Sequence, residues 1–261
     1  MFETTAKLPK TAMLQPPRDE FAETIKETNA VWFHAAPECF AFEGETSDVA
    51  SSWRALDAIS KAIPTKANKS GIRYSSAAIA SGVQCVKGVH CGVVAPQICE
   101  NPKHFTVAVI YQPSQEGEAL TLLSLNAGQL GKSKKQNYLF LSDDGGHYTV
   151  KDTLGAIGIE QPCSSSSRHP RMLIVTVLGE SLTFQENRNE ISGVKGSPPK
   201  LAGMTDLFIG CRSHRSGLQK TLGSSIILDV IFFPQQTLLQ PRVQLDQQLY
   251  TALHRYFLWS Y

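Results

Sequence analysis

The residues with the greatest capacity for chemistry lie in the loop Arg212-Ser213-His214-Arg215-Ser216-Gly217, which directly follows the strand-like run Leu207–Cys211. The planar fork of an arginine side chain matches a carboxylate through two parallel hydrogen bonds. Arg212, His214 and Arg215 are therefore candidate ligand-binding residues for an acidic sugar. An exposed polar loop without a ligand is the alternative interpretation of the same residues.

A second group of polar residues surrounds the segment Asp143-Asp144-Gly145-Gly146, whose composition is typical of a hairpin turn. His147 and Tyr148 follow this turn and are further candidates for ligand contact. The carboxylates of Asp143 and Asp144 could supply oxygen ligands to a calcium ion. A plain turn is the favoured interpretation of the two aspartates, so calcium is only a possible cofactor and no other cofactor is expected.

An enzyme is the first alternative to a binding protein. A retaining glycoside hydrolase needs two carboxyl groups about 5 Å apart. The nearest pair here is Glu186 and Glu190, which flank the turn-like segment Asn187–Asn189, and a solvated hairpin accounts for both. A lyase could use His147 and Tyr148 as acid and base, but it would also need an arginine, for which Arg171 or Arg188 is a candidate, and an Asn or Gln to neutralise the uronate carboxylate. Nothing in the sequence joins these residues, so no catalytic residue is assigned.

The chain has six cysteines: Cys39, Cys85, Cys91, Cys99, Cys163 and Cys211. A domain of this size has a core of its own and needs no disulfide staples, so most of them are expected to be small buried apolar residues. The group Cys85, His90, Cys91, Cys99 and His104 invites a zinc interpretation, yet it lacks the close Cys-x-x-Cys pairing of structural zinc sites. One disulfide within this group and unbonded thiols both remain open.

Composition excludes several classes of protein. Among 261 residues, 42% are hydrophobic and 18% are charged, and the formal net charge is +2. This near-neutral balance predicts no nucleic-acid partner. The one dense basic run, Lys132–Lys135, is expected to be a solvated loop. The longest apolar runs are far shorter than the roughly 20 residues of a membrane-spanning helix, so no membrane insertion is expected, and no signal peptide is visible.

Short strand-like runs separated by turn residues dominate the chain from residue 105 onward. Such runs, rich in β-branched and aromatic residues and repeated with hardly a helix between them, predict an antiparallel sandwich. Segment 47–64 carries Val49, Trp53, Leu56 and Ile59 at a spacing that fits a helix as well as an irregular strand. Trp32 and Trp53 are expected in the core. The predicted strands include Phe105–Tyr111, Leu120–Leu125, Tyr138–Leu141, His147–Val150, Met172–Leu178, Ser181–Phe184, Leu207–Cys211 and Ile226–Phe233.

Helical patterns occur only near the two ends. Residues 1–18 are polar and contain three prolines, which is typical of an arm, and Asp19–Thr28 could form a short helix with Phe21 and Ile25 on one face. At the other end, Leu245, Leu249, Leu253 and Phe257 recur every four residues and predict a helix that covers the sandwich. We therefore expect an arm or docking segment at residues 1–29 and a β-sandwich domain at residues 30–261.

Three sequence patterns resemble the concanavalin A-like lectin/glucanase superfamily in its laminin-G-like branch. They are the opening pair Val31–Ala36 and Val49–Leu56, the strand Phe105–Tyr111, and the closing pair Leu207–Gly210 and Ile226–Pro234. The resemblance covers about residues 30–258 and implies an all-β, antiparallel jelly-roll β-sandwich. Two departures, Arg54 after Trp53 and Ser224-Ser225 before the last strand, leave the fold expectation intact but weaken any transfer of a ligand site.

The fold alone does not choose a function, because this superfamily hosts lectins, adhesion modules and enzymes. We predict a non-catalytic, carbohydrate-binding adhesion module that recognises a cell-surface glycan, as a virion or phage-like particle component docked through residues 1–28. An extracellular or particle-associated location and a homo-oligomer go with this prediction. A polysaccharide lyase or glycoside hydrolase is the first alternative, and a structural assembly protein without sugar affinity is the second.

Overall fold

Two antiparallel β-sheets packed face to face form the body of the protein. The computed structural model describes residues 17–44, 47–76, 81–114, 117–127, 138–152, 155–164, 168–196, 201–218 and 221–261. The first sheet has the order β15 (Ser192–Lys195), β14 (Ser181–Glu186), β13 (Arg171–Leu178), β8 (His104–Gln112) and β17 (Ile226–Phe233). The far edge of β17 pairs with β1 (Val31–His34) and with β6 (Ser81–Gln84), and β6 pairs with β5 (Ile72–Ser76).

The second sheet faces the first across the main core. Its order is β12 (Gly158–Pro162), β11 (His147–Asp152), β10 (Tyr138–Asp144), β9 (Ala119–Ala127), β16 (Met204–Ile209), β7 (Val93–Glu100) and β4 (Lys61–Pro64). The 3-10 helix Pro37–Cys39 leads into β2 (Phe40–Phe42), which pairs with β3 (Val49–Arg54). Because β3 also pairs with β4 and β5, it joins the two sheets at this side.

The central strands of the first sheet are apolar on both faces. On β8, Val107, Val109 and Tyr111 point into the main core between the sheets, whereas Ala108 and Ile110 belong to a second cluster on the outer face. Side chains alternate between the two faces of a strand, so a continuous apolar run indicates a sheet covered on both sides. This is why β8, β13 and β17 are nearly unbroken runs of apolar residues.

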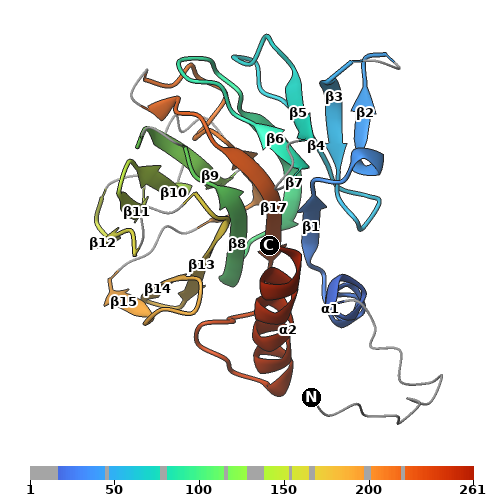
Figure 1. Ribbon diagram of the computed structural model, residues 1–261. Helices are drawn as coiled ribbons and strands as arrows, with labels where there is room; N and C mark the ends of the chain where they lie inside the picture. The colour runs from blue at the N-terminus through green and yellow to red at the C-terminus, as the bar shows by residue number, and fades with distance from the viewer. Residues whose placement is uncertain are drawn as a thin grey trace, which may run out of the picture.

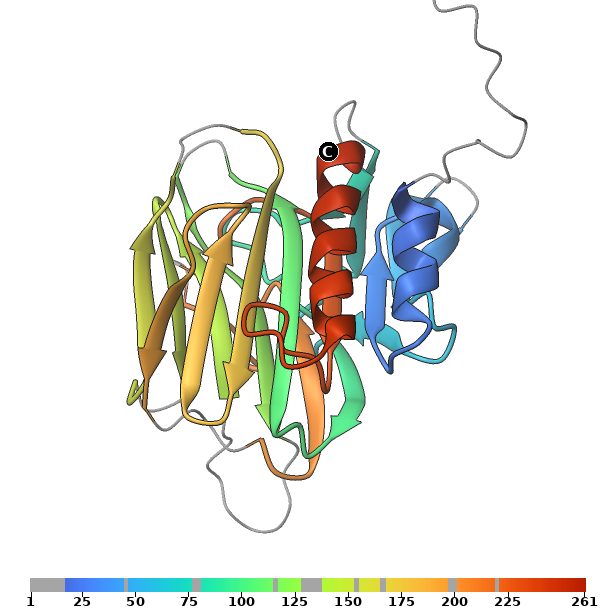
Figure 2. The same cartoon turned by 90° about the horizontal axis from the view of Figure 1, so that it is seen from below.

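Two helices supply the cover on the outer face. Figures 1 and 2 show α1 (Pro17–Ile25) and α2 (Gln244–Ser260) side by side on the same side of β8 and β17. Leu249 and Leu253 of α2 are fully buried there, with Leu245 and Phe257 packed against the same cluster. From α1, the Phe21 ring lies 4.8 Å from Trp32 and 5.4 Å from Tyr256, measured between ring centroids. The sandwich thus has a three-layer cross-section at the helices.

A buried carboxylate joins the outer cluster to the first sheet. Asp229 on β17 is fully buried, and its Oδ1 accepts a hydrogen bond from Trp32 Nε1 at 2.7 Å and lies 2.8 Å from His34 Nδ1. Its Oδ2 accepts hydrogen bonds from the hydroxyls of Tyr256 at 2.9 Å and Tyr261 at 2.5 Å. One side chain therefore connects β17, β1 and the C-terminal end of α2, with its cap residue Tyr261. Burial raises the pKa of both tyrosines, so they remain donors at neutral pH.

The all-β antiparallel sandwich with a C-terminal helix, predicted from the sequence, is confirmed, as is the burial of Trp32 and Trp53. Segment 47–64 resolves to strands: β3 and β4 with a turn at Asp57, which accepts hydrogen bonds from the backbone of Ile59 and Ser60. The predicted helix at Asp19–Thr28 begins and ends earlier, at Pro17 and Ile25. Residues 1–16 of the predicted arm and the run Lys132–Lys135 lie outside the described residues.

Among the described residues, the structure contains no helix with the length and apolar character that a membrane crossing requires.

One titratable group lies within the helix-covered layer without a hydrogen-bond partner. His254 on α2 is 1% exposed, and neither ring nitrogen has a partner in the described part of the chain. Its ring packs edge-on against Tyr250 with centroids 4.4 Å apart. Burial, assisted by the nearby positive charge of Arg188, lowers the pKa of His254 to about 4. The imidazole is therefore neutral when the protein is folded at neutral pH.

We predict that Asp229→Asn lowers the free energy of unfolding by about 2–4 kcal/mol, because an amide cannot accept from all the donors that surround the carboxylate. Tyr261→Phe removes one donor and leaves the carboxylate in place, so it should cost only about 1 kcal/mol. Urea unfolding followed by tryptophan fluorescence measures both. An Asp229→Asn variant as stable as the wild type would show that the carboxylate does not hold these elements together.

We also predict an acid-sensitive stability that depends on His254. The unfolded chain binds this proton with a pKa of 6.5 and the folded chain with a pKa of about 4. The neutral imidazole therefore makes its full contribution to the free energy of unfolding above pH 6.5. This contribution is lost as the pH falls toward 4. Between about pH 7 and about pH 5, the free energy of unfolding of the wild type should fall by about 2 kcal/mol more than that of His254→Phe. His147→Gln, a variant at an exposed histidine, is the control. Its free energy of unfolding should fall by as much as that of the wild type.

Candidate functional site

Four loops meet at one end of the sandwich. They connect β6 to β7, β8 to β9, β10 to β11, and β16 to β17. Backbone hydrogen bonds join them: Gly88 N donates to Leu222 O at 2.7 Å, and Gly223 N donates to Ala119 O at 2.9 Å. The β10–β11 turn touches the β8–β9 loop, since a side chain at Gly145 would come within 1.9 Å of Gly117 O. Distant segments of the chain thus form one surface.

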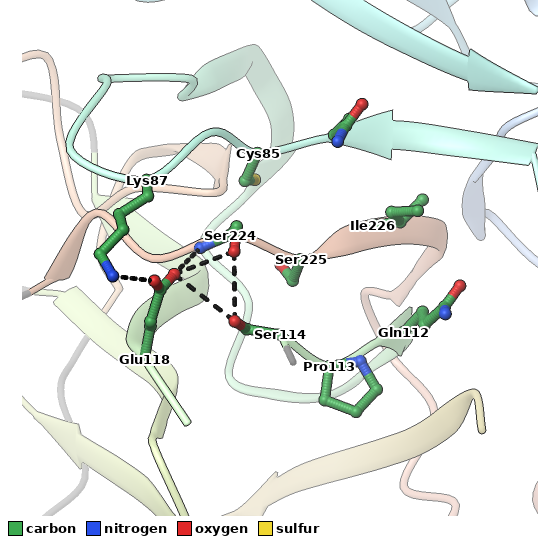
Figure 3. A pocket seen from close by; sticks show the side chains of 10 residues that line it. Cys85, Lys87, Gln112, Pro113, Ser114, Glu118, Ser224, Ser225 and Ile226 are labelled. Atoms are coloured by element: carbon green, nitrogen blue, oxygen red, sulfur yellow. Dashed lines mark hydrogen bonds and ion pairs between the residues drawn. The ribbon is translucent and has the colours of Figure 1, made fainter. Parts of the chain in front are cut away.

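A pocket of about 290 Å³ opens at this end, beside the first residue of β17 and the last residues of β6 and β8. Figure 3 shows its side chains, which are mostly polar and come from three loops. No aromatic ring lines it among the described residues. The groups available to a ligand in its wall are amides, hydroxyls, one carboxylate and one ammonium group, from Gln84, Lys87, Gln112, Ser114, Glu118, Ser224 and Ser225.

Several contacts fix the Glu118 carboxylate in the pocket wall. Its Oε2 accepts hydrogen bonds from Ser224 N at 2.8 Å and Ser224 Oγ at 2.9 Å, and from Ser114 Oγ at 3.4 Å. Its Oε1 lies 2.6 Å from the ammonium nitrogen of Lys87. Figure 3 shows these contacts converging on one carboxylate. The Glu118 side chain is only 11% exposed, so it is held in one position at the pocket edge.

Gln112 adds an acceptor on the other side of the pocket. Its Oε1 is buried, and no hydrogen-bond partner for this atom occurs among the described residues. Burying a carbonyl-type oxygen without a donor costs roughly 1–3 kcal/mol. After a rotation of the Gln112 side chain, this oxygen could accept a hydrogen bond from a ligand hydroxyl or amide N–H in the pocket. The pocket therefore combines a fixed carboxylate with an acceptor that lacks a donor.

Arg212 does not project freely from its loop. It is half-buried, its guanidinium carbon lies 3.6 Å from the centroid of the Phe140 ring, and its Nε donates to Thr121 Oγ1 at 3.2 Å. Arg212 O also accepts a hydrogen bond from Asn126 Nδ2 at 3.0 Å. Burial lowers the pKa of Arg212, and the Asp144 carboxylate opposes that shift. The residue packs against the outer face of the second sheet, next to the β10–β11 turn.

The other predicted loop residues are exposed. His214 packs the edge of its ring against Phe208, with ring centroids 5.2 Å apart, and Arg215 extends its side chain into solvent. Arg215 O lies 3.0 Å from His90 Nε2, which fastens this loop to the β6–β7 loop. His147 is exposed at the start of β11. The structure therefore brings Arg212, His214 and Arg215 to the loop end of the sandwich, but outside the pocket wall.

Tyr148 has a different environment from the one that the sequence suggested. It is 1% exposed and points between the sheets, where its hydroxyl donates to Glu186 Oε1 at 2.7 Å and accepts from Arg171 Nη1 at 2.9 Å. Burial raises its pKa. The ring cannot stack on a sugar at the surface from this position. Tyr148 and Arg171, which a lyase would need together, do meet, but inside the core.

The sequence suggested that Glu186 and Glu190 are both solvated, and this interpretation is wrong for Glu186. Glu190 is exposed, whereas Glu186 is fully buried and accepts hydrogen bonds from Tyr148, from Ser164 N at 2.9 Å and from Asn189 Nδ2 at 3.3 Å. Its position at the end of β14 turns it inward, next to the β13 arginine. The pair therefore does not form a surface carboxylate couple.

The two aspartates of the β10–β11 turn have separate roles. Asp143 is buried, and its Oδ2 accepts from the Tyr111 hydroxyl at 2.7 Å while its Oδ1 accepts from Gly145 N at 3.0 Å. Asp144 is exposed, and its Oδ2 accepts from Thr149 Oγ1 at 2.6 Å. Calcium at Asp143 and Asp144 stays a prediction, and an ion there would compete with these donors.

The cysteines of the described chain are free thiols. Cys39, Cys85 and Cys211 are buried, and Cys91, Cys99 and Cys163 are half-buried. No group of three or more His, Cys, Asp or Glu side chains in the described ranges is arranged to hold a metal ion. Cys99 and His104 lie on β7 and β8, in different sheets, which separates them from the β6–β7 loop.

The pocket residues Glu118, Gln112 and Ser224 were not identified from the sequence. Ser224-Ser225 stood out only as a departure before the last strand, and Glu118 follows a short polar stretch with no recognisable motif. Gln112 and Glu118 lie far from Ser224 along the chain, and they meet it only because β8 pairs with β17. The pairing of strands brings these residues together, and their spacing along the sequence does not reveal the site.

Comparison with known proteins gives structural likeness alone. No family model and no curated protein matches the sequence. Trypanosoma rangeli sialidase in complex with sialic acid is similar with a TM-score of 0.54 and 13% identity over 88% of this chain. A mutant of that sialidase displaying trans-sialidase activity has a TM-score of 0.53 and 13% identity over 91% of this chain. The CBM40 of Ruminococcus gnavus IT-sialidase bound to alpha2,3 sialyllactose has a TM-score of 0.42 and 14% identity, covering 58% of this chain and 83% of that one.

The chain spans 33% of the first of these sialidases and 38% of the mutant. At this identity the likeness shows that a sandwich of this kind occurs within those larger proteins, and it transfers no site residue.

We predict that Gly145→Ala disrupts the loop end of the sandwich. Gly145 has φ +79°, and the added methyl would lie 1.9 Å from Gly117 O. Gly155→Ala is the matched control, because Gly155 has φ +67° with no atom within 4 Å of the added methyl. The control should cost about 1 kcal/mol from backbone strain, and Gly145→Ala should cost at least about 2 kcal/mol more. If thermal or urea unfolding showed that the two variants lose the same amount of stability, the close contact between the two loops would be contradicted.

Proposed function

We propose that this protein is a non-catalytic, carbohydrate-binding module that recognises a glycan on a cell surface, with the ligand held in the pocket at the loop end. The observation that carries the proposal is the fixed Glu118 carboxylate opposite the buried Gln112 oxygen. Sugar hydroxyls are donors and acceptors at once, and a polar pocket with a few fixed acceptors suits them. The volume of about 290 Å³ lies at the lower end of the range of small-molecule pockets.

The sialidase likeness supports a carbohydrate ligand without choosing it. One sialidase of similar fold was seen in complex with sialic acid, a carboxylate-bearing sugar. The cationic groups at this end of the sandwich, Lys87 and the loop residues Arg212 and Arg215, are compatible with such a ligand. His214 and His147 are exposed at the same end and could extend the contact surface.

Binding is favoured over hydrolysis by the carboxylates available. Glycoside hydrolysis uses a pair of carboxyl groups on opposite sides of the scissile bond. Glu118 is the one carboxylate in the described wall of the pocket. The interior group Tyr148, Arg171 and Glu186 is too buried to receive a polysaccharide.

The proposal includes a role as a component of a virion or phage-like particle. Docking would use residues 1–28, of which the structure describes 17–28, and there Phe21 is already packed into the outer cluster. An extracellular or particle-associated location and a homo-oligomer belong to the same proposal. Oligomerisation without any sugar affinity would favour the structural assembly alternative instead.

Binding is tested on a glycan array and on whole cells, with affinities then measured by calorimetry. We predict that the wild type binds, and that Glu118→Gln and Gln112→Ala each weaken binding about tenfold to a hundredfold. Glu118→Gln replaces the carboxylate that holds Lys87, Ser114 and Ser224 in the pocket wall, and Gln112→Ala removes an acceptor for the ligand. Glu190→Gln, an exposed site outside the pocket, should leave affinity unchanged. No binding on either platform would overturn the proposal, and reducing ends released from polysaccharide would favour the enzyme alternative.

A further inference from the structure

The β6–β7 loop places two cysteine side chains together. Cys85 directly follows β6, and Cys91 comes shortly before β7. Between them the chain turns, with Val89 N donating to Val86 O at 3.0 Å, and Val86 N donates to Cys91 Sγ at 3.0 Å. The Cys91 sulfur therefore lies beside the Cys85–Val86 peptide bond, next to the Cys85 side chain. The loop is fastened at both of its sides to the β16–β17 segment, through Cys85 N to Ser225 O at 2.8 Å and Gly88 N to Leu222 O at 2.7 Å.

The two sulfurs differ in access and in charge. Cys85 is 1% exposed, whereas Cys91 is only half-buried. Cys91 Sγ accepts a hydrogen bond from Val86 N at 3.0 Å. The hydrogen bond with Cys85 lowers the pKa of Cys91 to about 7, and the Arg73 guanidinium acts in the same direction. The same hydrogen bond and burial raise the pKa of Cys85. The accessible sulfur is therefore the one stabilised as a thiolate.

The other cysteines of the chain do not share this environment. Burial raises the pKa of Cys39, Cys99 and Cys163, and it raises the pKa of Cys211 to about 12. Thiolates, not thiols, attack disulfides, so Cys91 stands apart in expected reactivity. Cys99 and Cys163 are half-buried like Cys91, and they serve as internal standards of similar access.

We propose that Cys85 and Cys91 form a thiol–disulfide exchange site that reacts with small disulfides such as oxidised glutathione. The Cys91 thiolate attacks one sulfur of oxidised glutathione, which forms a mixed disulfide and releases one glutathione thiolate. Cys85 then loses its proton to solvent, and its sulfur attacks Cys91 Sγ and displaces the second glutathione thiolate. The two protein thiols are oxidised to one disulfide, and oxidised glutathione is reduced to two molecules of glutathione.

The site adjoins the pocket but does not depend on the proposed function. Cys85 lines the pocket, and Lys87, on the same loop, pairs with Glu118. Figure 3 shows Cys85 and Lys87 on the same side of the pocket. A disulfide would tie the base of this loop together and so act on one wall of the pocket.

The experiment uses the full chain at about pH 7 with a graded excess of oxidised glutathione, followed by intact mass and peptide mapping. We expect the wild type to lose two hydrogen atoms in mass and the map to show a Cys85–Cys91 disulfide. Cys85→Ser should stop at a glutathione adduct on Cys91, and Cys91→Ser should react at least about tenfold more slowly. The matched control Cys163→Ser should react like the wild type.

A second measurement requires no variant. Iodoacetamide labelling of the wild type, resolved by peptide, should show Cys91 reaching half of its maximal rate near its pKa of about 7. The rates at Cys99 and Cys163 should still be rising above about pH 8.5. Labelling of Cys91 no faster than of Cys99 at neutral pH, or a disulfide that maps to another cysteine pair, would overturn the proposal.

Discussion

The buried Asp229 carboxylate is the constraint on which the helix-covered layer depends. A charge without solvent is stable only when donors surround it, and here Trp32, His34, Tyr256 and Tyr261 do so from two other elements. The first strand and the last turn of α2 must therefore take up their native positions together. With them comes Phe21 of α1, which packs between Trp32 and Tyr256. An apolar residue at position 229 could fill the space but would not specify which side chains meet there.

Much of the fold was predictable because it is local and periodic. Alternating or continuous apolar runs marked the strands β8, β13 and β17, and the four-residue spacing of Leu245, Leu249 and Leu253 marked α2. Segment 47–64 was ambiguous because its apolar spacing fits both a helix and strands. Only pairing of β3 with β2, β4 and β5 decides it. The partner strands lie in other parts of the chain, so the apolar pattern within segment 47–64 does not contain this information.

The candidate site was predictable only in part. The end of β16 was a sound place to look, since Arg212, His214 and Arg215 do lie at the loop end. The pocket itself is made by Gln112, Glu118 and Ser224, and their meeting depends on which strands are neighbours. Arg212 looked free in sequence because its partners, Phe140 and Thr121, are distant along the chain. Tyr148 and Glu186 looked exposed beside turns, yet strand alternation points both inward.

The connection from β17 to α2 fixes the helix at its other end. Thr106 Oγ1 accepts from Leu238 N at 3.0 Å and donates to Gln236 O at 2.9 Å, while Asp246 Oδ2 accepts from Thr237 Oγ1 at 3.1 Å and from Arg242 N at 2.9 Å. With Tyr256 and Tyr261 held at Asp229, α2 is anchored at both ends, so its length is as constrained as its composition. One inserted residue would rotate everything after it by about 100° around the helix axis and turn the anchoring tyrosines away. Evolution of this helix should therefore proceed by exchange of its outward residues, such as Gln247, Thr251 and Arg255, and not by changes in its length.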